Sequence, residues 1–169
     1  PAGSMGGYYT LAEVYTQINN MRTNYPGLVR IDTVGWTFGG NRVGAATPRP
    51  IWVVKISDNV NTDETTEAES LITGLTHARE GMSMMNVIFY MQYILENYGT
   101  NPRIKELIDN RQLYFVPVAN PDGYKYNQDS NPGGGGLHRK NRNQTNLTTN
   151  IGTDLNRNFE IGWNEIGIG

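Results

Sequence analysis

The first candidate for chemistry in this sequence is the segment His77-Ala78-Arg79-Glu80, which separates a histidine and a glutamate by three positions. An imidazole nitrogen and a carboxylate oxygen are both ordinary zinc ligands, and this offset lets them converge across a strand-to-helix turn. The carboxyl end of a strand in an α/β sheet is also a common place for ligands to bind. Taken alone, however, a His-x-x-Glu motif is common, and the simpler interpretation is a surface His beside a Glu at the start of an ordinary helix.

A second candidate is a run of basic and amide side chains. Residues 139–142 (RKNR) and 154–158 (DLNRN) together contain four basic residues and one acid, Asp154. An Arg side chain offers a planar fork that matches a carboxylate, and an amide adds a neutral donor beside it. The pattern predicts recognition of a small anion, and the alternative is a solvated basic face.

Two further polar segments suggest structure before chemistry. Residues 120–123 read Asn-Pro-Asp-Gly, two strong turn signals, and predict a tight turn that shapes the rim of a site. Oxygen-rich loops can hold calcium, but the spacing of an EF-hand is absent here, and a solvated acidic loop is the commoner outcome. The acidic loop in question carries five carboxylates and no base: Asp58, Asp63, Glu64, Glu67 and Glu69.

The composition narrows the possible functions. With 14 basic and 16 acidic residues among 169, the formal charge is −2 and the pI is near 5.7. This balance argues against a general nucleic-acid binder, and no apolar run approaches the roughly 18 residues of a membrane helix. The absence of cysteine excludes disulfides, thiolate ligands and cysteine nucleophiles within this chain. Abundant Gly, Tyr, Asn and Thr residues are typical of a secreted protein.

The elements that must position these motifs follow from hydrophobic spacing. Thr10 and Glu13 form a capping-box pattern in front of a helix with apolar residues at helical period. We expect strands at 28–36, 51–56, 70–76 and 113–118, the last two buried, and helices starting at 11, 81 and 102. Strands alternating with helices predict a single α/β domain with a mixed central β-sheet flanked by helices.

The motifs occur in one order along the chain: HARE at 77–80, NPDG at 120–123, RKNR at 139–142 and GTDLNRN at 152–158. This ordered set closely resembles the motifs of the zinc carboxypeptidases, the relatives of carboxypeptidase A. Its residues look most similar to those of the bacterial members. The likeness extends over nearly the whole chain. It implies an α/β fold with one zinc ion at the carboxyl-end edge of the sheet, and an exopeptidase that releases C-terminal amino acids from peptides.

The resemblance also implies a role for each matching residue. His77 and Glu80 match the first two zinc ligands. Arg139 matches the catalytic Arg that stabilises the oxyanion at the scissile carbonyl. Three residues match substrate-binding positions: Arg79 in the outer subsites, and Asn156 with Arg157 at the free terminal carboxylate.

One departure from the family pattern concerns the rest of the site. The family takes its third zinc ligand, a His, and its general-base Glu from positions well downstream of the Asn-Arg pair. His138 does not match that ligand, and Glu160 and Glu165 come too early to match the base. We therefore expect residues 1–169 to be the N-terminal portion of one metallocarboxypeptidase catalytic domain, apparently truncated. Such a chain is expected to be inactive alone and to bind the complementary C-terminal segment of the same domain.

Two other functions remain open for this sequence. One is a noncatalytic module that binds a carboxylate or a peptide, and the other is a related zinc amidase on the same scaffold. Intact His77 and Glu80 argue against the first, because a decayed metal site is expected to lose its ligands. The pair Asn156 and Arg157 argues against the second, because that pair binds a terminal carboxylate in the resembled family.

Overall fold

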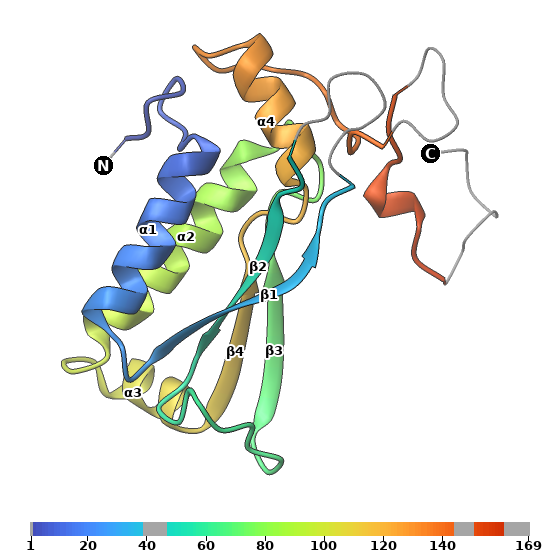
Figure 1. Cartoon of the computed structure of the whole chain (residues 1–169). Helices are drawn as coiled ribbons and strands as arrows, with labels where there is room; N and C mark the ends of the chain where they lie inside the picture. Colours follow the sequence, from blue (N-terminus) through green and yellow to red (C-terminus); the bar gives the residue numbers. More distant parts are fainter. Residues whose placement is uncertain (1, 39–46, 144–150, 161–169) are drawn as a thin grey trace.

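The computed structural model describes residues 2–38, 47–143 and 151–160 of the chain. Glu165 lies outside these residues. The described elements, in chain order, are α1 (Leu11–Asn24), β1 (Val29–Trp36), β2 (Pro50–Ile56), β3 (Ala68–Thr73), α2 (Gly81–Asn97), α3 (Pro102–Asp109), β4 (Arg111–Val116), α4 (Pro121–Ser130) and the short 3-10 turn η1 (Leu155–Arg157) (Figure 1). No described helix has the length and apolar character needed to cross a membrane.

Helix α1 begins where the sequence predicts it. The Glu13 amide donates to the Thr10 hydroxyl at 3.3 Å, and the Thr10 amide donates to the Glu13 carboxylate at 2.7 Å. This reciprocal capping box satisfies two amides that the first turn leaves without partners. The prediction of a capped helix is confirmed.

The four strands form one mixed sheet in the order β1-β2-β4-β3. Strands β1 and β2 pair antiparallel, as do β2 and β4, whereas β3 runs parallel to β4. Because β3 and β4 are parallel, the loops that leave their carboxyl ends meet at the same edge of the sheet. The segment containing His77 follows β3 and the Asn120 segment follows β4, so the topology brings two predicted motifs together. The α/β fold with a mixed sheet is confirmed.

The hydrophobic core lies between the sheet and the two long helices. Helices α1 and α2 lie side by side against one face of the sheet (Figure 1). Val54, Ile56, Leu113 and Phe115 on that face are buried, and the helices add Val14, Ile18 and other apolar side chains of the core. Truncating one of these large side chains, Phe115, to Ala removes about 3–5 kcal/mol of stability in comparable cores.

Strand β3 differs from its prediction. The sequence predicts a buried strand, but Leu71 is 66% exposed and most of the strand is exposed. The short apolar run is real, since Ile72 packs on the core. The strand is exposed because it occupies an edge of the sheet, a position that the sequence alone did not predict.

The Asn-Pro-Asp-Gly segment is also different from its prediction. In place of a tight turn, it forms the beginning of helix α4. Pro121 occupies the first helical turn, where its missing N–H costs nothing, and the Asn120 side chain accepts from the Gly123 amide at 3.1 Å. Local turn signals and helix N-cap signals use the same residue types, so the spacing alone did not separate them.

Candidate functional site

The turn between β3 and α2 holds His77 and Glu80 in a fixed backbone. The Ser83 hydroxyl accepts from the Leu75 amide at 2.8 Å and donates to the Glu80 carbonyl at 2.7 Å. Leu75 is fully buried and has a φ of +54°, a left-handed conformation that non-glycine residues seldom adopt. Strained backbone of this kind persists where surrounding contacts over-determine it, and it is common at functional sites.

The side chains of His77 and Glu80 converge across this turn. His77 Nδ1 lies 2.8 Å from the Glu80 Oε1. His77 is only 7% exposed, whereas Glu80 reaches the surface. The structure therefore brings the two predicted zinc ligands together at the carboxyl end of β3, with one ring nitrogen and one carboxylate oxygen facing the same point.

Asp154 lies on the opposite side of the imidazole. Its Oδ1 is 3.2 Å from His77 Nε2, a close electrostatic contact that is not aligned as a hydrogen bond. Histidines that bind metal commonly present their second nitrogen to a carboxylate, which sets the tautomer and the ring orientation. The donor set and this carboxylate fit a zinc ion at Nδ1. In the sequence Asp154 is distinguished only as the one acid among basic residues, a pattern that predicts no role for it.

Two donors keep the Asp154 carboxylate charged. Burial opposes its ionisation, but hydrogen bonds from Arg139 and from the Asn156 amide outweigh burial and lower the pKa of Asp154. The Arg139 Nε donates to Oδ2 at 2.8 Å, and the Asn156 amide donates to Oδ1 at 2.9 Å. Asp154 therefore connects the predicted metal ligand His77 to two other predicted site residues.

Arg139 also approaches the other candidate ligand. One of its terminal nitrogens lies 3.7 Å from Glu80 Oε1, and its carbonyl accepts from the Ala78 amide at 3.0 Å. We call His77, Glu80, Arg139 and Asp154 the site cluster. In the site cluster, His77 and Arg139 each lie close to both carboxylates, Glu80 and Asp154, so each carboxylate has a nitrogen donor beside it.

The remaining predicted residues lie at the surface. Arg79 is exposed beside an open cavity of about 140 Å³ that Tyr8 and Tyr124 also line. Asn156 and Arg157 form the exposed turn η1 directly after Asp154, whose carboxylate caps this turn. The structure thus ties the Asn-Arg pair to the site cluster through the backbone, and leaves both side chains accessible to a ligand.

Two buried amides hold the loops of the site together. Asn120 Nδ2 donates to the Lys140 carbonyl at 3.1 Å and contacts the Thr76 carbonyl at 3.4 Å. Asn127 Nδ2 donates to the carbonyls of Ala78 and His138 at 3.0 and 2.8 Å. Both side chains join the turn after β3 to the segment that carries Arg139. The expected structural role of the Asn-Pro-Asp-Gly segment at the rim agrees with these contacts.

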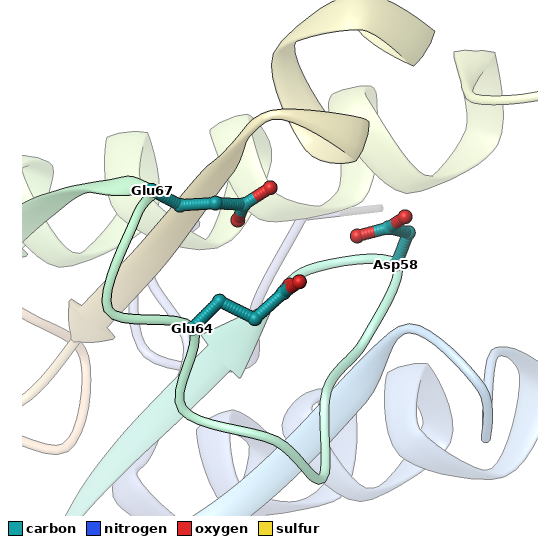
Figure 2. Close-up of side chains that lie close together, drawn as sticks. All are labelled: Asp58, Glu64 and Glu67. Atoms are coloured by element: carbon teal, nitrogen blue, oxygen red, sulfur yellow. The ribbon is translucent and has the colours of Figure 1, made fainter.

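The acidic loop forms a second cluster, away from the predicted ligands. Oxygen atoms of Asp58, Glu64 and Glu67 lie within 4.8 Å of one another (Figure 2). Burial, followed by the neighbouring Glu64 and Asp58 carboxylates, raises the pKa of Glu67. Calcium takes about six to eight oxygen ligands, and three carboxylates without further evidence of an ion do not support a calcium site. We call these three residues the acidic cluster.

A buried lysine anchors the loop of the acidic cluster. Lys55 is fully buried, and its Nζ donates to the Thr62 carbonyl at 2.5 Å, to Gln112 Oε1 at 2.7 Å and to Asp63 Oδ1 at 3.0 Å. Gln112 also donates to the Glu64 carbonyl at 2.7 Å. The expected acidic loop is therefore divided, because Asp63 turns toward Lys55 while three other acids face one another.

Comparison with known proteins agrees with the geometry. Residues 14–169 match the zinc carboxypeptidase family. A zinc carboxypeptidase of Saccharothrix mutabilis subsp. capreolus is 38% identical over 93% of this chain, which covers 33% of that protein. An inactive metallocarboxypeptidase of Saccharomyces cerevisiae is 29% identical over 92% of this chain and is 34% covered.

Solved structures show the same fold. The crystal structure of thrombin activatable fibrinolysis inhibitor superposes with a TM-score of 0.75 and 28% identity, over 92% of this chain and 35% of that one. The chain thus spans about a third of the length of the curated relatives it matches. The sequence match over residues 14–169 and the shared fold lead to one conclusion: this chain belongs to the zinc carboxypeptidase family.

Proposed function

We propose that this chain is the N-terminal portion of a catalytic domain that removes C-terminal amino acids from peptides. The observation that carries the proposal is the convergence of His77 Nδ1 and Glu80 Oε1 at 2.8 Å, with Asp154 behind the ring. The pair lies at the carboxyl end of a strand, which is the usual place for a binding site in an α/β fold.

His77 and Glu80 would hold the zinc ion that the family implies. Bound zinc would supply Lewis-acid polarisation of a peptide carbonyl and activation of water. The part of this chain is to fix the ligands: Asp154 orients the imidazole, and the Ser83 hydroxyl holds the Glu80 backbone. Two protein ligands are fewer than the three that a catalytic zinc site normally has, so we expect weak zinc affinity in this chain alone.

Four residues would act on the substrate. Arg139, 3.7 Å from Glu80, is placed to stabilise negative charge as it develops at the scissile carbonyl. The exposed Asn156 and Arg157 would bind the terminal carboxylate of the peptide, and Arg79 would contact an outer residue. A charge-assisted hydrogen bond from Arg157 is worth roughly 1.5–3 kcal/mol of binding.

The site would be completed by a complementary segment of the same domain. The chain spans about a third of its curated relatives, and the proposed third ligand and general base would come from the remainder. General-base help is worth about 10²–10⁴ in rate, so we expect no turnover by residues 1–169 alone.

Extracellular peptides are the proposed substrates, and detection of the protein in culture medium rather than in cells tests this location.

A single-chain chimera tests the proposed function. In it, the 169 residues are followed by the part of the Saccharothrix relative that lies C-terminal to its matched region. With zinc, the chimera should release the terminal residue of a blocked peptide but not of the same peptide amide, because only the free acid offers a carboxylate to Arg157. Equal hydrolysis of acid and amide would favour the amidase, and tight peptide binding without zinc or turnover would favour the noncatalytic module.

Two arginines near the site allow a matched control. In the chimera, Arg139→Ala should lower kcat more than Arg142→Ala. In the described part of the chain, Arg142 lies over the Tyr126 ring at 3.8 Å and forms no ion pair with His77 or Glu80, whereas Arg139 approaches Glu80. A larger loss of kcat in Arg142→Ala would move the oxyanion role from Arg139 to Arg142. Arg157→Ala should instead raise KM for the free acid.

A further inference from the structure

A cavity of about 180 Å³ lies between the end of β1, the start of α4 and the turn η1 (Figure 1). We call it the β1–α4 cavity. None of the described residues that line it belongs to the site cluster or to the predicted substrate-binding residues Arg79, Asn156 and Arg157. Its volume is below the roughly 300–1,000 Å³ of sites for drug-sized molecules, so it has room for one small ring.

Two exposed aromatic side chains line the β1–α4 cavity. Trp36, the last residue of β1, is 64% exposed, and Phe38 is 56% exposed. The Thr37 amide donates to the Arg49 carbonyl at 2.9 Å, and the Thr37 hydroxyl accepts from the Arg49 amide at 2.8 Å, so pairing of the two strands continues past Trp36. Side chains two positions apart on an extended chain share a face, and the two rings therefore form one apolar platform.

The polar side chains of the cavity are fixed by the fold but keep unused hydrogen-bonding groups. Asp122 is 6% exposed, and its Oδ1 accepts from Arg49 at 2.6 Å. Asn141 Oδ1 accepts from the Asn143 and Thr153 amides at 3.1 and 2.8 Å. Within the described part of the chain, Asp122 Oδ2 and Asn141 Nδ2 form no hydrogen bond. Because polar groups in such positions are nearly always bonded, the cavity offers one acceptor and one donor to a ligand.

The charges at the cavity favour a neutral ligand. Among the described residues that line it, Arg142 is the one cation, and its guanidinium lies 3.8 Å from the centre of the Tyr126 ring. Arg49 is already paired with Asp122. An anionic ligand would meet the unbonded Asp122 oxygen without a spare cation beside it, which disfavours binding.

We propose that the β1–α4 cavity binds one neutral sugar ring, such as a hexose unit of a glycan. A pyranose ring presents a face of C–H groups that packs on an aromatic ring, and its hydroxyls both donate and accept. Trp36 and Phe38 take the C–H face, Asp122 Oδ2 accepts from one hydroxyl, and Asn141 Nδ2 donates to another. The proposal does not depend on the proposed peptidase function, because no residue of the site cluster takes part.

Two other ligands that pack on aromatic rings use the cavity less completely. A proline-rich peptide docks on exposed rings, but a proline residue has no N–H to donate to Asp122. A nucleobase stacks on aromatic side chains, but nucleotide phosphates need unengaged cations, and the chain carries a formal charge of −2. A sugar ring is favoured because it uses the platform, the acceptor and the donor together.

Saturation-transfer NMR with monosaccharides tests the proposal on the 169-residue chain and on the chimera. Glucose, galactose, mannose and N-acetylglucosamine are the probes, and at least one should bind both proteins with a Kd of about 1–10 mM, as expected for a ligand of this size. No saturable binding of any probe would overturn the proposal, as would tighter binding of adenosine or of a blocked tetraproline peptide. Binding that is lost in the chimera would also overturn it, since the rest of the domain would then cover the cavity.

Substitutions locate the bound sugar. Trp36→Ala should raise the Kd about 10-fold, and Phe38→Ala should also raise it, which keeps the test decisive if Trp36→Ala does not fold. Val34→Ala is the matched control, because Val34 is 62% exposed on the same strand and does not line the cavity. An unchanged Kd in both ring variants, or an equal change in Val34→Ala, would place the sugar elsewhere and refute the assignment.

Monodeoxy forms of the best-binding sugar test the two hydrogen bonds. Removal of a hydroxyl that pairs with Asp122 or Asn141 leaves that group unbonded, so at least one deoxy sugar should bind about 5-fold more weakly or worse. Equal binding by the whole deoxy series would show that only the aromatic platform holds the ring, and would overturn the assignment of Asp122 and Asn141 as the polar contacts.

Discussion

The site cluster and the acidic cluster both gather side chains that can bind metal ions, but their charges are arranged differently. In the site cluster, Arg139 separates the carboxylates of Glu80 and Asp154, and the His77 ring lies between the same two acids. In the acidic cluster, Asp58, Glu64 and Glu67 face one another, and the two neighbouring carboxylates influence Glu67 more strongly than the cations Arg111 and Lys55 do. The candidate metal site is therefore distinguished by paired opposite charges and an oriented imidazole, and not by the number of its carboxylates.

The two clusters are also held in different ways. The site cluster is held by direct bonds among its own members, together with the amides of Asn120 and Asn127. The acidic cluster depends on an anchor outside it, since Lys55 bonds the neighbouring Thr62 and Asp63 and not its three carboxylates. Substitutions in the two clusters should therefore change stability in opposite directions.

Among the substitutions that test this contrast, Asp154→Ala should have the largest effect. The substitution removes the partner of Arg139 and the cap of η1 and leaves His77 Nε2 without its carboxylate, so we expect a loss of about 2–3 kcal/mol in the free energy of unfolding. Urea denaturation measures this loss. Asp129→Ala is the matched control, because Asp129 pairs with Lys125 at the surface and should cost less than about 1 kcal/mol. Equal losses would show that the site cluster is not held by Asp154.

Lys55→Met should have the next largest effect. It preserves the buried volume but leaves the Thr62 carbonyl and Gln112 Oε1 with fewer donors, and the expected loss is about 2 kcal/mol. Lys105→Met is a suitable control, since Lys105 is half-exposed in its pair with Asp109. Exchange of the amides in residues 58–67 should also become faster in Lys55→Met. Unchanged exchange there would contradict the role of Lys55 as the anchor.

Glu67→Gln should have the opposite sign. It removes one of three facing carboxylates, so the free energy of unfolding should rise by up to about 1 kcal/mol at pH 7 with a chelator present. The gain should shrink as the pH falls, because the raised pKa of Glu67 lets the folded wild-type protein take up a proton and lose the repulsion. A loss of stability in Glu67→Gln would show that the acidic cluster is held by an attraction that the described contacts do not include.

The smallest effect concerns His138, in the segment that leads to the site cluster. Burial, which outweighs the hydrogen bond to the Asn141 carbonyl, lowers the pKa of His138 from 6.5. The unfolded chain therefore binds more protons just below pH 6.5, and stability should fall as the pH drops from 6.5 through the folded pKa. NMR titration of the imidazole measures this directly, and His77→Ala leaves His138 as the single histidine of the sequence. A pKa at or above 6.5 would be the contrary result.

Local chemistry in the sequence determined much of the fold and part of the site. The capping box of Thr10 and Glu13 and the helical period of α2 act between near neighbours, so they were readable without the fold. The spacing of His77 and Glu80 likewise places both side chains on one turn, and that pair converged as predicted.

Only the tertiary structure decided the contacts between distant segments. Asp154 lies 77 positions after His77, and no periodicity relates the two; the parallel pairing of β3 with β4 and the amides of Asn120 and Asn127 bring them together. The same is true of β3, whose apolar residues read as buried until the strand order placed them at an edge. Burial and charge pairing depend on which strands are neighbours, and that choice is made by the packing of the whole domain rather than by any local run of residues.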